Sequence, residues 1–318
     1  MVKKNLTIKY SGVWVGRIFM LTILYMLIWG MGSLIVAGQI PDQTSEPGLA
    51  DGMWGFFILS VINTLLIVSL IVSSRWHGWR LAALLGMAYY GSFTVITQIE
   101  TWYFLTGITV SGELLLALFL MGLPVPFIYI PLAILICGRW KPVRQEKEIM
   151  DRVMSTNQFL LKLVIIAFGY LLIYWCAGYY IAWQNPELRT FYGSPGEITP
   201  FWEHTLTTFK NEPGLILLQL GRGILFVFIA IPVIRGSMVN PWLTACLVGL
   251  LLSVPHLVHI LPNPFIPLAS VRFSHMIETV ISNFLFGLFI AWLLRRRHQG
   301  GKNWMGQKMK LQPTKYQP

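Results

Sequence analysis

The chain has 318 residues, of which 55% are hydrophobic and only 12% are charged, and its mean hydropathy is +0.62. A soluble globular domain carries roughly 25% charged residues, so this composition excludes a soluble protein and predicts an all-α integral membrane protein. The net charge of +11 does not indicate a nucleic-acid partner, because most basic residues fall on alternate loops. The intervening loops carry only Arg189, Lys210 and Arg272. The expected partner is the lipid bilayer.

Eight apolar segments approach or exceed the ~20 residues with which an α-helix crosses a bilayer. In chain order, the predicted spans are 13–38, 53–73, 80–104, 113–137, 159–183, 214–234, 241–261 and 274–294. Pro124, Pro126 and Pro131 interrupt the fourth span, which predicts a kinked or broken helix there.

Loop charge predicts the orientation of these spans. Basic residues gather at 139–147 and 295–297, whereas acidic residues occur at 42–51 and 187–212. Cytoplasmic loops carry an excess of Lys and Arg, so both termini and the linker 139–158 are predicted to be cytoplasmic, in a plasma-type membrane. The longest outer loop is then the segment between the fifth and sixth spans, where we predict a short interfacial helix around 200–210.

An internal repeat runs through all eight spans. Four patterns occur twice in the same order: Y-x-L-I at 25–28 and 170–173, E-P-G-L at 46–49 and 212–215, W-x2-A-x-L-x-G at 79–86 and 242–249, and E-x5-F-L-x-G-L at 113–123 and 278–288. This order indicates a gene duplication that produced two tandem four-helix repeats, 1–145 and 146–318, the second of which carries a basic tail. Because four is even, the two repeats are expected to be parallel and related by an axis along the membrane normal.

The head of the eighth span carries the most informative polar residues. Arg272, His275 and Glu278 follow one another at steps of three, which places them on one face of a helix. Thr279 and Ser282 extend this polar stripe along the span. Ionisable groups at membrane depth are costly and therefore mark a functional site by default.

Other charged residues are predicted to lie at the same membrane level. Arg222 belongs to the sixth span, Glu100 ends the third span and Glu113 begins the fourth span. An unpaired guanidinium in hydrocarbon is too costly to persist, so Arg222 is expected to pair with Glu278, Glu113 or Glu100. Glu113 and Glu278 occupy equivalent positions in the two repeats, whereas Arg222, Arg272 and His275 have no ionisable equivalent in the first repeat. The second repeat is therefore expected to contribute most of the site.

The leading functional hypothesis is the transport or binding of a small solute, a cation or a proton at an outward-facing polar site between the repeats. Glu278 and Glu113 would bind the cation or proton, with Arg222 as the counter-charge and His275 tuning protonation. Arg272 and Glu100 complete the candidate site. This hypothesis requires no cofactor.

Two alternatives remain open from the sequence. In a metal-dependent membrane hydrolase, His256, His275 and Glu278 would hold zinc or iron, and the metal would activate water. In a non-catalytic assembly subunit, the charged residues would only hold helices together. The sequence contains no pattern that fixes the oligomeric state.

Overall fold

The computed structural model describes residues 2–40, 44–50, 52–142 and 156–296. Over these ranges the chain is helical, with no β-strand. Eight of the helical segments are long and apolar enough to cross a membrane, and each coincides with one of the predicted spans to within a few residues. The chain is therefore a polytopic membrane protein, because eight such apolar helices need lipid around them.

The first four spans use eight helical segments. In chain order these are α1 (Val2–Ser33), α2 (Gly52–Ser73), α3 (Gly78–Tyr90), η1 (Gly91–Val95), α4 (Ile96–Leu105), α5 (Gly112–Met121), η2 (Val125–Tyr129) and α6 (Ile130–Ile136), with η1 and η2 being wider π-helical turns inside the third and fourth spans. The turn η2 follows Pro124, so the predicted break in the fourth span is confirmed.

The last four spans and their long connection follow. They comprise α7 (Thr156–Ala177), η3 (Gly178–Ala182), α8 (Pro186–Phe191), α9 (Phe201–Asn211), α10 (Pro213–Gly236), α11 (Pro241–Ser253), η4 (Val254–Ile260) and α12 (Ala269–Arg295). The short helix predicted around 200–210 is α9. Together, η3 and α7 make the fifth span, and η4 completes the seventh.

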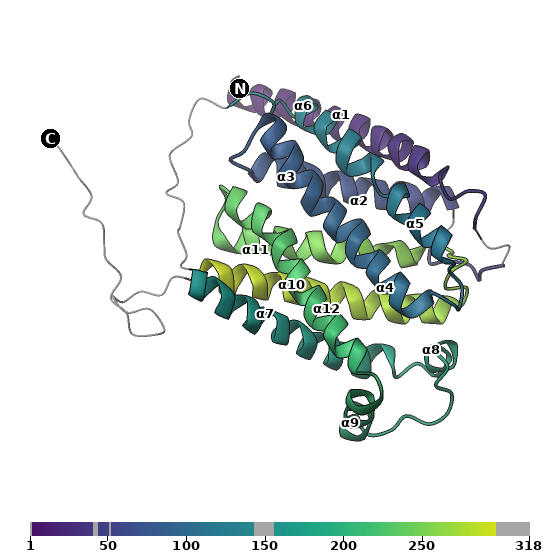
Figure 1. Cartoon of the computed structure of the whole chain (residues 1–318). Coiled ribbons are helices and arrows are strands. Elements are labelled where there is room, and N and C mark those ends of the chain that lie inside the picture. The colour runs from purple at the N-terminus through teal and green to yellow at the C-terminus, as the bar shows by residue number, and fades with distance from the viewer. Residues whose placement is uncertain (1, 41–43, 51, 143–155, 297–318) are drawn as a thin grey trace.

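The two sets of four spans occupy two sides of one bundle (Figure 1). Between them, α10 packs against α3 and η1, and α11 packs against α2 and η1. The connection that contains α8 and α9 lies at one end of the bundle, which we call the loop end (Figure 1). Hydrophobic side chains from both sets share one continuous buried core, as expected of helices packed along their length.

Glycines bring neighbouring spans close together in both sets. A β-carbon on Gly86 would lie 2.9 Å from the carbonyl oxygen of Pro126, in the fourth span. A β-carbon on Gly249 would likewise lie 2.9 Å from the carbonyl oxygen of Phe284, in the eighth span. Small residues permit this close approach of membrane helices, so the third and fourth spans meet as the seventh and eighth spans do.

Tyrosines connect a further pair of spans in each set. Tyr25 of the first span packs edge-on against Tyr129 of the fourth, with ring centroids 5.2 Å apart. Tyr170 of the fifth span packs against Phe286 of the eighth, with ring centroids 4.8 Å apart. The first span therefore contacts the fourth through the same type of residue with which the fifth contacts the eighth.

The buried polar groups of the first four spans form an uncharged network. The hydroxyl of Tyr89 donates a hydrogen bond to Oδ1 of Asn63 at 2.9 Å, and the hydroxyl oxygens of Tyr25 and Tyr89 are 2.9 Å apart. Tyr129 donates to the hydroxyl of Thr64 at 3.2 Å. Hydroxyl and amide groups satisfy one another inside this part of the membrane bundle, and none of them brings a formal charge.

Candidate functional site

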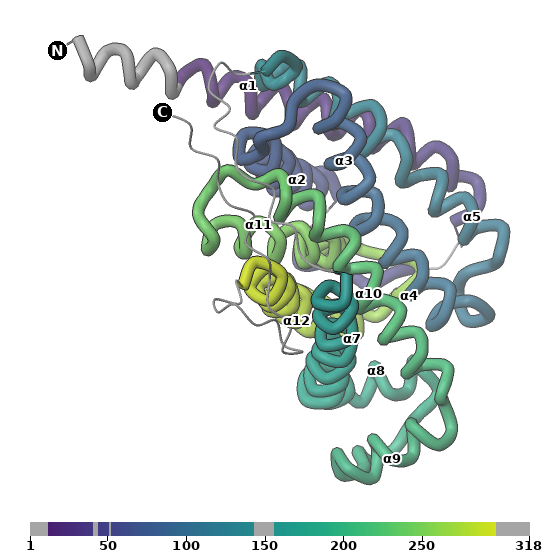
Figure 2. Tube along the Cα trace, turned by 60° about the vertical axis from the view of Figure 1, so that its left-hand side comes forward, coloured from purple at the N-terminus to yellow at the C-terminus, as the bar shows by residue number. Residues whose placement is uncertain are grey.

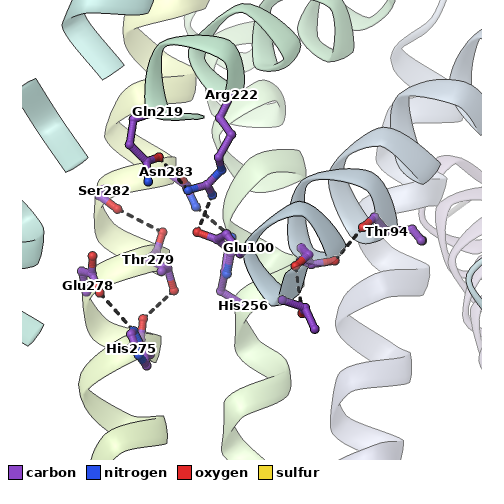
Figure 3. Close-up of polar contacts among 12 residues, drawn as sticks. Thr94, Glu100, Gln219, Arg222, His256, His275, Glu278, Thr279, Ser282 and Asn283 are labelled. Atoms are coloured by element: carbon purple, nitrogen blue, oxygen red, sulfur yellow. Dashed lines mark hydrogen bonds and ion pairs between the residues drawn. The ribbon is translucent and has the colours of Figure 1, made fainter. Parts of the chain in front are cut away.

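Arg222 lies inside the bundle, in α10, and only 1% of its surface is exposed. Its Nη2 atom is 2.5 Å from Oε1 of Glu100, in the middle of α4, and its Nη1 donates to Oε1 of Gln219 at 2.8 Å (Figure 3). The guanidinium also lies over the ring of Tyr170, 5.4 Å from its centroid. The predicted pairing of Arg222 with an acid is confirmed, and the acid is Glu100.

This ion pair joins the two sets of spans, because Glu100 belongs to the third span and Arg222 to the sixth. The side chain of Glu100 is 23% exposed, whereas that of Arg222 is 1% exposed. A buried guanidinium carries its charge under all conditions, and the carboxylate compensates it in place of water. Arg222 is thus committed to Glu100 and Gln219, and it is not the counter-charge of Glu278.

A second polar chain runs along the head of α12. Nδ1 of His275 lies 3.2 Å from Oε2 of Glu278, and Nε2 of His275 lies 2.9 Å from the hydroxyl of Tyr192, just after α8. The side chain of Glu278 is only 7% exposed and that of His275 is 20% exposed. Figure 3 shows His275 and Glu278 on the same face of α12.

The direction of these hydrogen bonds depends on the tautomer and charge of the imidazole. An ionised carboxylate only accepts hydrogen bonds, so Nδ1 of His275 is the donor toward an ionised Glu278. A neutral ring with its proton on Nδ1 accepts from Tyr192 through Nε2, whereas a protonated ring donates to Tyr192. Burial raises the pKa of the Tyr192 hydroxyl, which keeps its proton. The three side chains therefore form a hydrogen-bonded chain from the loop end to the buried carboxylate.

The fifth span supplies the neighbouring wall of Glu278. Oε1 of Glu278 lies 3.6 Å from the position that a β-carbon on Gly178 would occupy, so this oxygen faces the backbone of the fifth span. Gly178 begins η3, a π-helical turn. Such turns inside α-helices occur frequently at functional sites, and here the turn lies against the carboxylate.

The proposed metal ligands do not converge in the structure. Nδ2 of Asn283 lies 2.8 Å from Nε2 of His256, and because an amide nitrogen only donates, the lone pair of that histidine nitrogen is occupied. His275 instead contacts Glu278 and Tyr192. Within the described residues, no three His, Cys, Asp or Glu side chains are placed to hold a metal ion. The geometry gives the metal hypothesis no support.

Arg272 has a structural role. It is 1% exposed, and its guanidinium donates to the carbonyl oxygens of Ile266 and Pro267 at 2.9 and 2.7 Å. It also donates to the carbonyl oxygens of Glu46 and Pro47 at 2.7 and 2.9 Å. Arg272 thereby links the segment before α2 to the segment before α12 at the loop end. Its guanidinium group is engaged by these four carbonyl oxygens.

Glu113 does not contact the other candidate site residues. It is exposed in the first turn of α5, and in the part of the chain that the structure describes no hydrogen bond or ion pair connects it with Arg222, His275 or Glu278.

The two hydroxyl residues of the polar stripe of α12 bond within their own helix. Thr279 donates to the carbonyl oxygen of His275 at 2.5 Å and Ser282 to that of Thr279 at 3.4 Å, so both hydroxyls serve the backbone of their own helix.

Sequence reasoning did not identify three residues that form hydrogen bonds with the candidate site residues Arg222, His256 and His275. Gln219 precedes Arg222 by one helical step in an otherwise apolar run, and Asn283 follows Glu278 in the polar stripe of α12. Both could have been found as polar residues inside a span, which are rare and functional. No sequence pattern indicated Tyr192, because it lies in a connection rich in aromatic residues. Its contact with His275 arises only from the tertiary fold.

The site thus combines a fixed ion pair, Arg222 with Glu100, and the Tyr192–His275–Glu278 chain. The first links the two sets of spans, and the second links the connection after α8 to the buried Glu278 of α12. No protein-family model matches the chain, and no curated protein or solved structure matches it either.

Proposed function

We propose that the protein binds a small solute or cation and carries it across a membrane, with Glu278 as the group that takes up a proton or cation. One observation carries this proposal. Glu278 is buried in the eighth span, and in the described part of the chain its one partner at salt-bridge distance is His275. A carboxylate without a permanent counter-charge is costly in a membrane interior, and uptake of a proton or cation removes that cost.

The engagement of Arg222 elsewhere supports this proposal. Arg222 is neutralised by Glu100 at 2.5 Å, so no permanently charged guanidinium compensates Glu278. His275 is an imidazole, the type of side chain that gains and loses a proton most readily near neutral pH. It connects Glu278 to Tyr192 and thus offers protons a route toward the loop end.

We propose further that the two sets of four spans are tandem parallel repeats, 1–145 and 146–318. Matched packing supports this relation. Gly86 and Gly249, which the repeat aligns, each approach the backbone of the following span. Tyr25 and Tyr170, also aligned by the repeat, each pack against the last span of their set. The first repeat contains an uncharged hydroxyl and amide network and contributes Glu100 to the site, whereas Arg222, His275 and Glu278 belong to the second repeat.

The repeat makes a geometric prediction. Superposition of residues 13–137 on residues 159–294 in a structure determined in lipid should require a rotation about the membrane normal, because both repeats begin on the same side. An axis in the membrane plane would contradict parallel repeats. A fit that aligns only single helices, with no common rotation, would contradict the duplication itself.

We infer from loop charge that the loop end faces outside and that both termini are cytoplasmic. A reporter fused at position 195, between α8 and α9, should give an extracellular signal. Fusions at positions 145 and 310, which lie outside the described residues, should give cytoplasmic signals. A cytoplasmic signal at position 195 would contradict the proposed topology. Signals from opposite sides at positions 145 and 310 would contradict an even number of spans between them.

The transport proposal is tested with purified protein in sealed vesicles that contain a pH-sensitive dye. Gradients of sodium, potassium or a divalent cation should drive a change of internal pH, and protein-free vesicles provide the baseline. The variant Glu278→Gln should return the signal to that baseline. Wild-type vesicles that behave like empty vesicles under every gradient would count against coupling and favour the assembly-subunit hypothesis.

A further inference from the structure

The helix α9 presents an unusual stripe of exposed apolar side chains. Trp202 is 73% exposed, Leu206 is 69% exposed and Phe209 is 45% exposed. Their spacing of four and three residues places them on one face of a helix, and we call them the α9 stripe. Exposure of three neighbouring large apolar side chains to water is unfavourable. We therefore expect another apolar surface to cover the α9 stripe.

A second face of α9 holds the helix against the bundle. The ring of Phe201 stacks on Tyr180 at 5.3 Å between centroids, and Trp175 donates its indole N–H to the hydroxyl of Thr205 at 2.9 Å. His204 packs beside Tyr179, with ring centroids 5.5 Å apart. These contacts fix the rotation of α9 about its axis, so the α9 stripe cannot turn inward without breaking them.

The third face of α9 is polar. Its exposed residues are Glu203, Thr207, Lys210 and Asn211. On a helical wheel they lie on the side away from the α9 stripe and from the bundle face. A helix with one side against protein, one apolar side and one polar side is suited to the boundary between lipid and water, where the polar side is hydrated and the apolar side enters the acyl region.

The surroundings of α9 continue its apolar side. Tyr180 of η3 is 60% exposed, and Leu172 of α7 and Leu217 of α10 are 65% and 71% exposed. These side chains belong to the lipid-facing surfaces of the fifth and sixth spans, which α9 connects. Figure 2 shows α9 projecting sideways from the bundle beside the ends of α7 and α10.

We propose that α9 is a lipid-binding element that seats Trp202, Leu206 and Phe209 among phospholipid acyl chains at the membrane interface of the loop end. Tryptophan favours this level of the bilayer. Burial lowers the pKa of His204, so the bundle-facing histidine is neutral at neutral pH and adds no charge beside the lipid. The proposal does not depend on the transport function or on which side of the membrane the loop end faces.

Photo-crosslinking in the full-length chain tests this inference without removing the native cysteines. Leu206→p-benzoylphenylalanine places the reactive group in the α9 stripe, and Thr207→p-benzoylphenylalanine places it one residue away on the polar face. Both variants are reconstituted in nanodiscs of phosphatidylcholine and phosphatidylglycerol, illuminated and analysed by mass spectrometry. Leu217→p-benzoylphenylalanine, on the exposed side of α10, is the positive control for lipid contact.

Phospholipid adducts at position 206 should approach the yield at position 217 and exceed that at position 207 several-fold. Equal yields at positions 206 and 207 would overturn the proposal, because the α9 stripe would then contact lipid no more than the polar face does. A crosslink from position 206 to a second copy of the chain would also overturn it, since the stripe would be a protein interface. Unfolding temperatures equal to that of the wild type identify the variants that are folded and comparable.

Discussion

The variant Arg222→Ala is expected to lower the free energy of unfolding by about 3 kcal/mol, because removal of one partner of a buried ion pair leaves the other without compensation. It leaves Glu100 and Gln219 without their shared donor, and it removes the guanidinium from its place over the ring of Tyr170. Unfolding of the purified protein in detergent, followed against temperature or denaturant, measures the loss.

The reverse variant, Glu100→Ala, should destabilise the protein more than Arg222→Ala does. Glu100 is 23% exposed and can be partly hydrated when its partner is lost, whereas Arg222 is 1% exposed and cannot be. The stranded guanidinium keeps its charge because arginine does not deprotonate in proteins. The exposure of the two partners therefore predicts the order of the two variants.

A double-mutant cycle provides the control. The variant with both Arg222→Ala and Glu100→Ala should be more stable than the sum of the two single losses implies, because neither charge is stranded. Strictly additive losses would show that the two side chains do not interact in the folded protein. Recovery of the double variant to near wild-type stability would show that the ion pair contributes little net free energy of unfolding.

The variant Glu278→Gln is expected to abolish proton or cation uptake while leaving the folded protein largely intact. Glutamine keeps the shape of the side chain and can accept the hydrogen bond from Nδ1 of His275, but it cannot bind a proton or balance a cation. Cation binding followed against pH should lose its pH dependence. Infrared spectra recorded in acidic and alkaline buffer should lose the band of the protonated carboxyl group.

Glu113→Gln is the matched control for this experiment. Glu113 occupies the corresponding position of the proposed repeat, but it is exposed in the first turn of α5 and does not contact Glu278 or His275 in the described part of the chain. Its replacement should therefore change binding little. If Glu278→Gln lowers the unfolding temperature and the pH response stays as in the wild type, Glu278 is structural, and the assembly-subunit hypothesis replaces the transport hypothesis.

The sequence alone predicted the eight spans, the break in the fourth span and the short helix α9. These features follow from local chemistry. A span must be long and apolar because backbone groups in lipid can be satisfied only within the helix itself, and Pro124 and its neighbours remove backbone donors wherever they occur. The same reasoning predicted that Arg222 has an acidic partner, because the cost of its charge does not depend on the fold.

Only the tertiary structure decided which partner each polar residue has. Arg222 had three possible acids and is paired with Glu100, while Arg272, on the same predicted stripe as Glu278, binds four backbone carbonyl groups at the loop end. Tyr192 reaches His275 across a long connection. In a membrane helix both the lipid-facing and the core-facing sides are apolar, so the sequence pattern does not fix how each helix is rotated. That rotation is set by packing between spans, and it determines which polar side chains meet.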